Sequence, residues 1–365
     1  MAKLGEVCLL KAGKFVSAND ISPEYNKGLY PCFGGNGIRG YVADYTHDGE
    51  FPLIGRQGAL CGNVNLAFGK FHATEHAVVV QPKIEMNVHW LYYALNAMNL
   101  GQYATGAAQP GLAVSKLETL SIEIPNISEQ NKIAQTLYKV EQLVNFRKQQ
   151  LAKLDELVKA RFVEMFGTFP ANPFRWSIGK IQDVVSDVRY GSSRPAVEGG
   201  KYPYLRMNNI TYSGELDLRD TKRIDIPDSE LDKCTVRRGD VLFNRTNSKE
   251  LVGKTCVYNR DELMVLAGFV IRVRINERIR PEVLSAFLNM DFSKRMLIGM
   301  CKTAIGQANI NAKELQNIDL YIPPIELQDQ FVTLKNKIDQ QKQTVQQSLE
   351  KLELMKKALM QEYFG

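Results

Sequence analysis

Two stretches of the chain carry apolar side chains at alternating spacings of four and three positions. They cover residues 128–167 and 326–365. Such spacings keep one face of an α-helix apolar and, repeated over many turns, predict a long helix that pairs with another. In the first stretch the apolar positions are Ile133, Leu137, Val140, Val144, Leu151, Leu154, Val158 and Met165. Arg147 and Arg161 interrupt this face, whereas the second stretch has Val345 and Leu359 there, so the helices are predicted to pair with each other.

Residues 1–127 and 168–325 show a different pattern, with short β-rich runs between turn residues. Strands are predicted at 52–54, 78–80, 240–243 and 269–273. One short amphipathic helix is predicted in each region, at 90–97 and at 281–289. Residues 168–175 contain two prolines and are predicted to be a linker. The pattern predicts an α+β fold: two similar β-rich domains, each followed by a long helix, with the two helices pairing with each other.

The two halves of the chain are related by an internal repeat. Pro125 and Pro323 are 198 residues apart, and the same shift places Gln130 on Gln328 and the Phe-Gly pair at 166–167 on that at 364–365. Upstream the match continues at shorter shifts, with Leu91 on Leu284 and Arg56 on Arg245, as insertions in loops would cause. A repeat of this length indicates two copies of one structural unit.

Charge is unevenly distributed over these regions. The formal net charge is +6, and residues 168–325 contribute most of it, with 24 basic and 19 acidic residues. Residues 1–127 have 9 basic and 10 acidic residues. A basic region favours a polyanionic partner, with an ordinary solvated surface as the alternative.

Several classes of protein are not indicated by the sequence. The chain has no apolar run of membrane-spanning length and its first residues do not form a signal peptide, so a cytoplasmic protein is expected. Its six cysteines are scattered without a C-x-x-C pair, which favours buried, reduced thiols. His72 and His76 have a metal-ligand spacing for a helix, but they precede a strand pattern and lack further ligands.

The segment Gly34–Gly40 contains the glycine spacing of a dinucleotide-binding fingerprint. That motif requires a buried strand before it and a helix after it, so that the helix N-terminus faces a phosphate. Here Tyr30–Phe33 includes a proline and Tyr41–Tyr45 has a strand pattern. The segment is therefore predicted to be a turn between strands that exposes Asn36 and Arg39.

The order of these features resembles the DNA-specificity subunit of type I restriction-modification enzymes over essentially the whole chain. The resemblance is carried by the following residues: Tyr30-Pro31, Gly34–Tyr41, Leu53–Gly58, Gly62-Asn63, Ile124-Pro125, Gln130, Phe166-Gly167, Tyr202–Met207, Arg238–Leu242, Gly253-Lys254, Pro323-Pro324 and Gln328. Each of these motifs has low specificity by itself, whereas their order along the chain and their duplication are specific.

The resemblance implies recognition domains at 1–127 and 168–325, followed by spacer helices at 128–167 and 326–365. Each domain would read one half of a bipartite site in double-stranded DNA. The helices would pair as an antiparallel coiled coil and dock two methyltransferase subunits, which use S-adenosylmethionine, and restriction (motor) subunits, which use ATP and Mg²⁺. No cofactor is expected in this chain. Candidate DNA-binding residues lie in glycine-flanked loops, because arginine suits guanine or phosphate and asparagine or glutamine suits adenine. They are Asn36, Arg39, Arg56, Gln57, Asn63, Ser192, Ser193, Arg206, Asn208, Asn209, Arg245, Thr246, Asn247 and Lys249.

No catalytic site is predicted. The sequence has no Asn/Asp-Pro-Pro-Tyr/Phe motif of adenine methylation and no G-x-x-x-x-G-K-[ST] motif of nucleotide hydrolysis. The alternative function is a coiled-coil scaffold that binds only proteins. Individual loop residues also have structural alternatives: Arg206 could pair with a core carboxylate, and Arg56 and Arg245 could be framework because both halves contain them.

Overall fold

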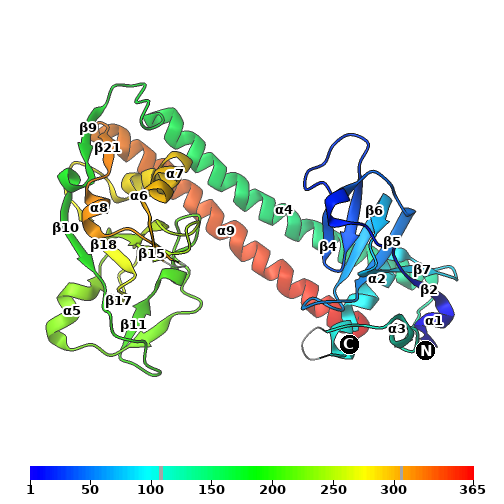
Figure 1. The fold of residues 1–365 in the computed structure, drawn as a ribbon. Coiled ribbons are helices and arrows are strands. Elements are labelled where there is room, and N and C mark those ends of the chain that lie inside the picture. The colour runs from blue at the N-terminus through cyan, green and yellow to red at the C-terminus, as the bar shows by residue number, and fades with distance from the viewer. Residues whose placement is uncertain (107–109, 305–306) are drawn as a thin grey trace. The chain divides into compact units, whose positions relative to one another are not determined.

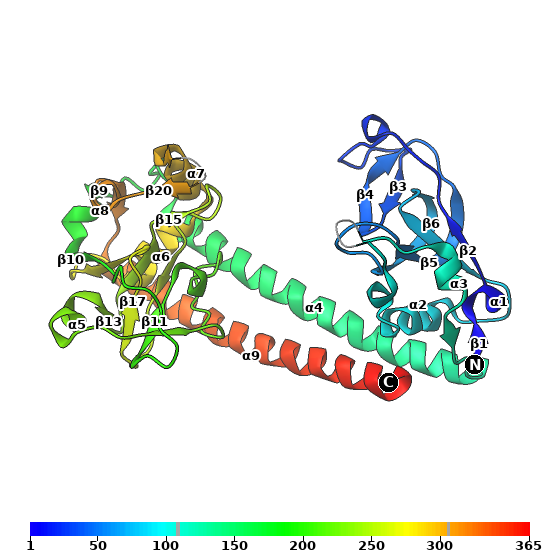
Figure 2. The same ribbon diagram turned by 60° about the horizontal axis from the view of Figure 1, so that its bottom comes forward.

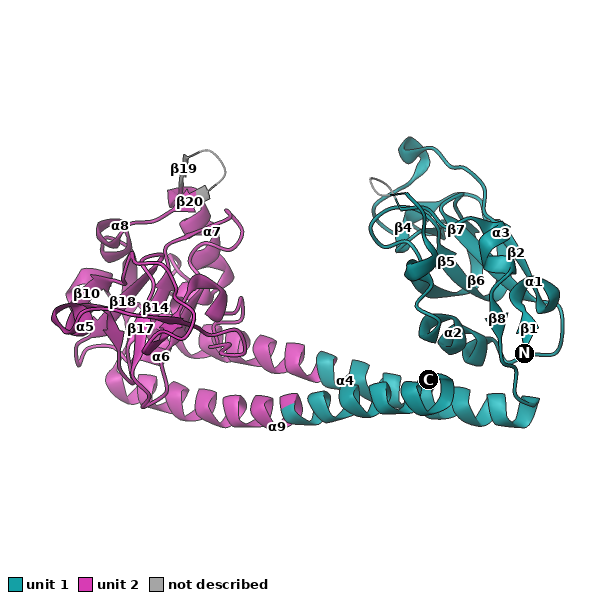
Figure 3. Ribbon diagram, turned by 90° about the horizontal axis from the view of Figure 1, so that it is seen from below, with its two compact units in different colours: residues 1–148, 347–365 teal, residues 149–346 magenta. Residues whose placement is uncertain are grey.

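The computed structural model describes residues 1–106, 110–304 and 307–365 (Figure 1). It contains two compact units, coloured separately in Figure 3: unit 1 has residues 1–148 and 347–365, and unit 2 has residues 149–346. The long helices are α4 (Ile127–Phe166) and α9 (Ile325–Phe364), each of 40 residues. Each unit thus combines one β-rich domain with parts of both long helices, and the predicted α+β class is confirmed.

Unit 1 is built on a six-stranded sheet in the order β2-β7-β5-β6-β3-β4. Neighbouring strands are antiparallel, except that β3 and β6 are parallel. The strands are β2 (Cys8–Ala12), β3 (Tyr30–Gly34), β4 (Gly37–Val42), β5 (His47–Gly55), β6 (Val64–Ala73) and β7 (Ala77–Pro82). The smaller elements are β1 (Ala2–Lys3), α1 (Leu4–Val7), η1 (Ala18–Asp20), η2 (Leu100–Tyr103), α3 (Val114–Glu118) and β8 (Ser121–Ile122). Helix α2 (Val88–Ala97) packs on β5 and β6 and lies beside α4 (Figure 2).

Unit 2 has two four-stranded sheets, in the orders β10-β18-β14-β16 and β12-β11-β17-β13. Their strands are β10 (Val185–Tyr190), β11 (Tyr202–Leu205), β12 (Lys222–Ile224), β13 (Thr235–Val236), β14 (Val241–Asn244), β16 (Thr255–Val257), β17 (Met264–Leu266) and β18 (Val270–Ile275). Smaller sheets pair β21 (Asp319–Ile322) with β9 (Ser177–Lys180), and join β15 (Thr246–Asn247), β20 (Gln307–Asn309) and β19 (Lys302–Ala304). The helical elements are η3 (Ile181–Val184), η4 (Met207–Asn209), α5 (Asp228–Cys234), α6 (Pro281–Asn289), α7 (Asp291–Met300) and α8 (Ala312–Gln316). One short helix per domain is therefore too few, and α7 in particular lies outside the predicted elements.

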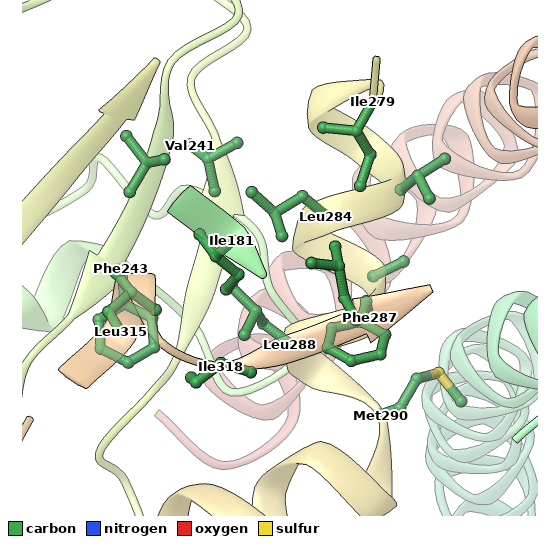
Figure 4. Packing of buried hydrophobic residues seen from close by; sticks show 14 of the residues in the cluster. Ile181, Val241, Phe243, Ile279, Leu284, Phe287, Leu288, Met290, Leu315 and Ile318 are labelled. Carbon is green, nitrogen blue, oxygen red and sulfur yellow. The ribbon is translucent and has the colours of Figure 1, made fainter. Parts of the chain in front are cut away.

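The core of unit 2 forms where α6 packs against β14 (Figure 4). Leu284, Phe287 and Leu288 of α6 are at most 1% exposed, and they belong to the same buried cluster as Val241 and Phe243 of β14. Their spacing of three and four residues places them on one face of the helix, as the amphipathic pattern predicts. Burying this face fixes the end of β14, from which a candidate DNA-binding loop begins.

Helices α4 and α9 contact each other within each unit. In unit 1, Lys356 Nζ lies 2.7 Å from Glu141 Oε1, and Arg147 Nε donates to Ser348 Oγ at 3.1 Å. In unit 2, Lys342 forms an ion pair with Asp155. In unit 1 the partner numbers rise along one helix as they fall along the other, so the two segments are antiparallel there. A single coiled coil that runs continuously through both helices stays a prediction.

Lys342 occupies a position on the apolar face of α9, and its side chain is only 10% exposed. Burying an unpaired ammonium group would be costly. Here it forms ion pairs with both Asp155 and Glu215. Burial by itself lowers the pKa of Lys342, but these two carboxylates outweigh it and raise that pKa above its ordinary value. The polar interruption of the apolar face is thus compensated by acids around it.

A buried glutamine near the start of each long helix anchors the short helix of the same domain. Gln130 Oε1 accepts from the Asn87 N–H that precedes α2 (2.9 Å), and its Nε2 donates to Pro125 O (2.8 Å). The repeat is preserved in unit 2. There Gln328 Oε1 accepts from Arg280 N (2.8 Å), and its Nε2 donates to Pro323 O (2.8 Å). These bonds explain why glutamine and proline recur together at the shift of 198 residues.

Replacing Gln328 by alanine is expected to lower the free energy of unfolding of unit 2 by about 2–4 kcal/mol. The substitution leaves the Arg280 N–H and the Pro323 carbonyl without a partner, and each unsatisfied buried group costs about 1–3 kcal/mol. Gln330→Ala, on an exposed position of the same helix turn, is the control and should change stability by no more than about 0.5 kcal/mol. Chemical unfolding followed by circular dichroism measures both, and equal stabilities would contradict this role.

Candidate nucleic-acid interface

In unit 1 the candidate loops meet at the turn between β6 and β7, residues 74–76, which we call the junction turn. Three segments form backbone hydrogen bonds with this turn or the residue before it: Lys14 N with Ala73 O (2.8 Å), Thr74 N with Phe33 O (2.9 Å) and Arg56 N with His76 O (3.0 Å). The segments follow β2, end β3 and follow β5. Loops far apart in the sequence are therefore gathered at one end of the sheet.

Unit 2 repeats this arrangement around the turn between β17 and β18, residues 267–269, its own junction turn. The corresponding backbone bonds are Ser192 N with Leu266 O (2.6 Å), Ala267 N with Leu205 O (2.8 Å) and Arg245 N with Phe269 O (3.0 Å). The strand pairing beside the turn is also repeated. In unit 2, β11 runs parallel to β17, the strand before the junction turn, just as β3 runs parallel to β6 in unit 1. The same loop positions thus converge in both units, although their sequences differ.

Glycines permit this convergence because backbone approaches backbone closely. A Cβ atom on Gly55 would lie 1.9 Å from Gly35 O. On Gly13 it would lie 2.0 Å from Ala73 O, and on Gly191 it would lie 2.1 Å from Leu266 O. No other residue type fits at these distances. The close approaches of Gly13 and Gly191 place their loops against the junction turns, and that of Gly55 places the end of β5 against the β3–β4 turn.

The glycine motif at Gly34–Gly40 forms a hairpin between β3 and β4, as predicted. Gly37 has a φ of +94°, a value that favours glycine, at the start of β4. The segment leads into a strand rather than a helix, so it offers no helix N-terminus to a phosphate. The motif shapes a turn and exposes the side chain of Asn36.

The structure brings most of the unit 1 candidates together. Asn63 Nδ2 donates to Asn36 Oδ1 at 2.7 Å, which joins the β3–β4 turn to the loop after β5. Gln57 lies in that same loop, where its backbone pairs with Gly111. The stem of Arg39 crosses Gly34, with Cδ 2.5 Å from where a Cβ of Gly34 would lie. The side chains of Asn36, Arg39, Gln57 and Asn63 are exposed, and Arg56 is half-buried.

The unit 2 candidates separate into exposed and internal residues. Ser193, Asn208 and Lys249 are exposed, and Asn247 is half-buried. Arg206 is also half-buried and donates from NH2 to Asp220 Oδ2 at 2.9 Å. That carboxylate is 73% exposed, so it is not the core carboxylate considered from the sequence.

Three unit 2 candidates lie inside the domain, contrary to their expected exposure: Ser192 (5% exposed), Asn209 (2%) and Thr246 (5%). Asn209 Oδ1 accepts from Arg206 N (2.9 Å) and its Nδ2 donates to Asp217 O (2.8 Å). Thr246 Oγ1 accepts from Asn309 Nδ2 at 3.0 Å, and Ser192 Oγ accepts from Arg194 N at 3.2 Å. These side chains hold the loops in place rather than face solvent, because their hydrogen bonds are made within the domain.

Two buried lysines of unit 2 stabilise its loops by donating hydrogen bonds to backbone carbonyls. Lys254 Nζ donates to Met207 O at 3.1 Å, and Lys294 Nζ donates to Gly253 O at 2.5 Å. Burial, reinforced by Lys159 and Lys254, lowers the pKa of Lys294 to about 7. Lys294 lies on α7, the helix that the sequence pattern did not predict.

The structure also shows surface residues that the sequence reasoning missed. Lys14 and Phe15 occupy in unit 1 the position of Ser192 and Ser193 in unit 2, and Phe15 is 76% exposed. In unit 2 the junction turn carries Phe269, which is 53% exposed. The internal repeat could have indicated the position of Lys14 and Phe15, because a shift of 178 residues superposes Gly13-Lys14 on Gly191-Ser192.

Other kinds of site find no support in the described part of the chain. His72 lies in β6, with Nε2 3.2 Å from Lys14 O, and the described residues contain no group of three or more His, Cys, Asp or Glu side chains placed to hold a metal ion. The six cysteines are free; burial raises the pKa of Cys8 to about 11 and of Cys256 to about 12, which disfavours the reactive thiolate. No helix within residues 1–106, 110–304 and 307–365 is long and apolar enough to cross a membrane.

A family model described as the type I restriction modification DNA specificity domain matches residues 1–156 and 175–354. The type I restriction enzyme EcoprrI specificity subunit of Escherichia coli is 53% identical over 143 residues, which cover 39% of this chain and 36% of that protein. The EcoKI specificity subunit of Escherichia coli strain K12 is 22% identical over 316 residues, covering 81% of this chain and 64% of that protein. The chain therefore spans less than two thirds of the length of either relative.

Two solved structures share the fold over the full length of the chain. The type I restriction-modification system S subunit from M. genitalium has a TM-score of 0.64 at 18% identity, with 95% of its own chain covered. A chain from a study of the assembly and conformational transition of the type I R-M system has a TM-score of 0.55 at 17% identity, with 96% covered. At these identities the likeness concerns the fold alone.

Proposed function

Because the chain belongs to the type I restriction-modification DNA specificity family, we propose that it recognises a bipartite site in double-stranded DNA, one part with each recognition domain. The observation that carries this proposal is the duplicated junction turn. Each unit gathers loops from at least three places in the sequence around such a turn and exposes polar and basic side chains there. Loops held on a rigid scaffold are the usual carriers of binding residues.

The exposed side chains suit direct reading of bases. In unit 1, Asn36, Gln57 and Asn63 supply amide groups that pair with adenine N6 and N7, and Arg39 suits guanine or phosphate. Unit 2 exposes a different set, with Asn208 and Lys249 among them. Since the two sets differ, the two parts of the site differ in sequence, which makes the site asymmetric.

The long helices supply the docking surface for other subunits. Shallow clefts lie at equivalent positions near the start of both helices, with Asn131 and Gln135 lining one and Asp329 and Thr333 the other. Each pair is related by the repeat shift of 198 residues. Equivalent surfaces suit two copies of one partner, and we assign them to two methyltransferase subunits, with restriction subunits completing the complex.

In this role the chain itself performs no catalysis. The methyltransferase subunits use S-adenosylmethionine, and the restriction subunits use ATP and Mg²⁺. We place the function in the cytoplasm, where the complex meets chromosomal DNA. The remaining alternative, a scaffold that binds only proteins, leaves the exposed polar loops of both units without a ligand.

The purified chain is expected to show negligible methyltransferase, nuclease and ATPase activity, and site-specific DNA methylation is expected only when a methyltransferase subunit is added. Binding of duplex DNA by this complex should weaken steeply as salt rises, because each phosphate contact releases counterions. Filter binding across a salt series and methylation assays test both points. Robust methyl transfer by the chain alone would contradict the non-catalytic role, and a complex that binds no DNA at any salt concentration would favour the protein-only scaffold.

A further inference from the structure

Arg56 and Arg245 occupy the same place in the two recognition domains. Each follows directly on the end of a strand, β5 or β14, and donates its backbone N–H to the junction turn. Each also accepts a backbone hydrogen bond from a second equivalent segment: Leu112 N donates to Arg56 O, and Ile310 N donates to Arg245 O, both at 2.9 Å. The backbone of each arginine is thus fixed on two sides.

The neighbouring equivalent positions do not keep their chemistry. Gln57 corresponds to Thr246, and Lys14 corresponds to Ser192. In the junction turns themselves, His76 corresponds to Phe269. Against this varied background, an arginine is retained in both units. A side chain that is the same in both domains is suited to a chemical group that both parts of the DNA site have in common.

Both arginines hold a positive charge that carboxylates do not neutralise within the described part of the chain. The side chains are half-buried, and the Nε atom of each is buried without a hydrogen-bond partner among the described residues. Arg245 is held by neutral groups, since its NH2 donates to Asn309 Oδ1 at 3.0 Å and its guanidinium lies 4.8 Å from the centre of the Tyr190 ring. A half-buried cation without a carboxylate partner is costly until an anion completes its environment.

Several other arginines in unit 2, in contrast, form ion pairs with carboxylates. Arg238 pairs with Asp261 at 2.7 Å, and Arg194 pairs with Glu230 at 2.7 Å. Even the candidate Arg206 has Asp220 as a partner at 2.9 Å. The contrast indicates that Arg56 and Arg245 are kept available for an external anion at the centre of each loop cluster.

We propose that Arg56 and Arg245 each bind a phosphate group of the DNA backbone and thereby position their domain without reading sequence. The inference rests on the proposed DNA-binding function and assigns a division of labour within it. Phosphate is present in both parts of the site whatever their bases, and the planar guanidinium binds it with paired hydrogen bonds. The exposed loop side chains that differ between the units then supply the sequence preference.

The test uses the full chain assembled with methyltransferase subunits and two DNA duplexes. One duplex carries the site found by mapping methylated bases, and the other carries the same bases scrambled in both parts. Arg56→Ala and Arg245→Ala are each expected to reduce affinity for both duplexes by about fivefold at 0.15 M salt, with the salt slope lowered by about one. The ratio of the two affinities should stay unchanged. Arg56→Lys and Arg245→Lys, which keep the charge, should restore the slope.

Arg238→Ala is the matched control, because it removes the same charge from an exposed ion pair and should alter neither the affinity nor the slope. Circular dichroism confirms that each variant is folded. Loss of affinity on the target duplex alone would show that the arginines read bases, and normal binding by both alanine variants would show a framework role; either result overturns the inference while leaving the proposed function intact. If the unaltered complex binds neither duplex, the proposed function fails with it.

Discussion

Replacing Gly55 by alanine is expected to destabilise unit 1 by about 3 kcal/mol or more and to abolish DNA binding by its recognition domain. The added methyl group would lie 1.9 Å from Gly35 O. That oxygen belongs to the backbone of the β3–β4 hairpin, so relief requires the hairpin to move away from the end of β5. Forced overpacking against backbone exceeds the cost of about 1–3 kcal/mol that flexible side chains allow.

The matched control is Gly111→Ala. Gly111 pairs with Gln57 in the same loop cluster, but among the described residues outside its own chain neighbours the nearest atoms to a Cβ there lie 3.9 Å away. Thermal unfolding and DNA binding of the two variants, each assembled with methyltransferase subunits, measure the effect. A Gly55→Ala protein as stable as the control would show that the hairpin can retreat freely, and would remove the argument that glycines hold the loops together.

The long helices could be predicted because their signal is local. Apolar residues at spacings of four and three specify a helix face without knowledge of the rest of the fold. The predicted range 128–167 and the observed Ile127–Phe166 differ by one residue at each end. What the pattern could not show is how Lys342 is accommodated on that face, because Asp155 and Glu215 come from other parts of the chain.

The repeat also misled the prediction at one point. Equating the halves suggested one short helix in each, whereas unit 2 has α7 directly after α6. Met290 separates the two helices in an extended conformation, with a ψ of 149°. A comparison of matching positions shows only what the two copies of a repeat share. It therefore cannot show an element, such as α7, that is inserted in one copy.

Residue type alone could not separate contact residues from framework residues. Asn208 and Asn209 are adjacent and chemically identical, yet Asn208 is exposed and Asn209 is 2% exposed. Asparagine serves equally well to bind a base edge or to satisfy nearby backbone groups. The decision depends on hydrogen bonds to Arg206 and Asp217 that only the folded domain reveals.

Lengthening both long helices by four residues is expected to lengthen the spacer between the two parts of the DNA site by one or two base pairs, without changing the bases that are read. The insertions follow Lys148 on α4 and Gln346 on α9, at the boundaries of the two units. Four helical residues add about 6 Å and a net rotation of about 40°. One or two base pairs add about 3–7 Å and a rotation of about 35–70°, so translation and rotation change together.

The expectation follows from the lengths of the helices, since 40 residues at about 1.5 Å each span about 60 Å, more than the roughly 34 Å of one DNA turn. Neither insertion touches a recognition loop. Inserting the same four residues after Arg260, in the exposed turn between β16 and β17, is the control and should leave the spacer unchanged. Genome-wide mapping of methylated sites decides the outcome. An unchanged spacer with full methylation would show that the helices do not set the distance, because the added turn would then have been absorbed without moving either domain along the DNA.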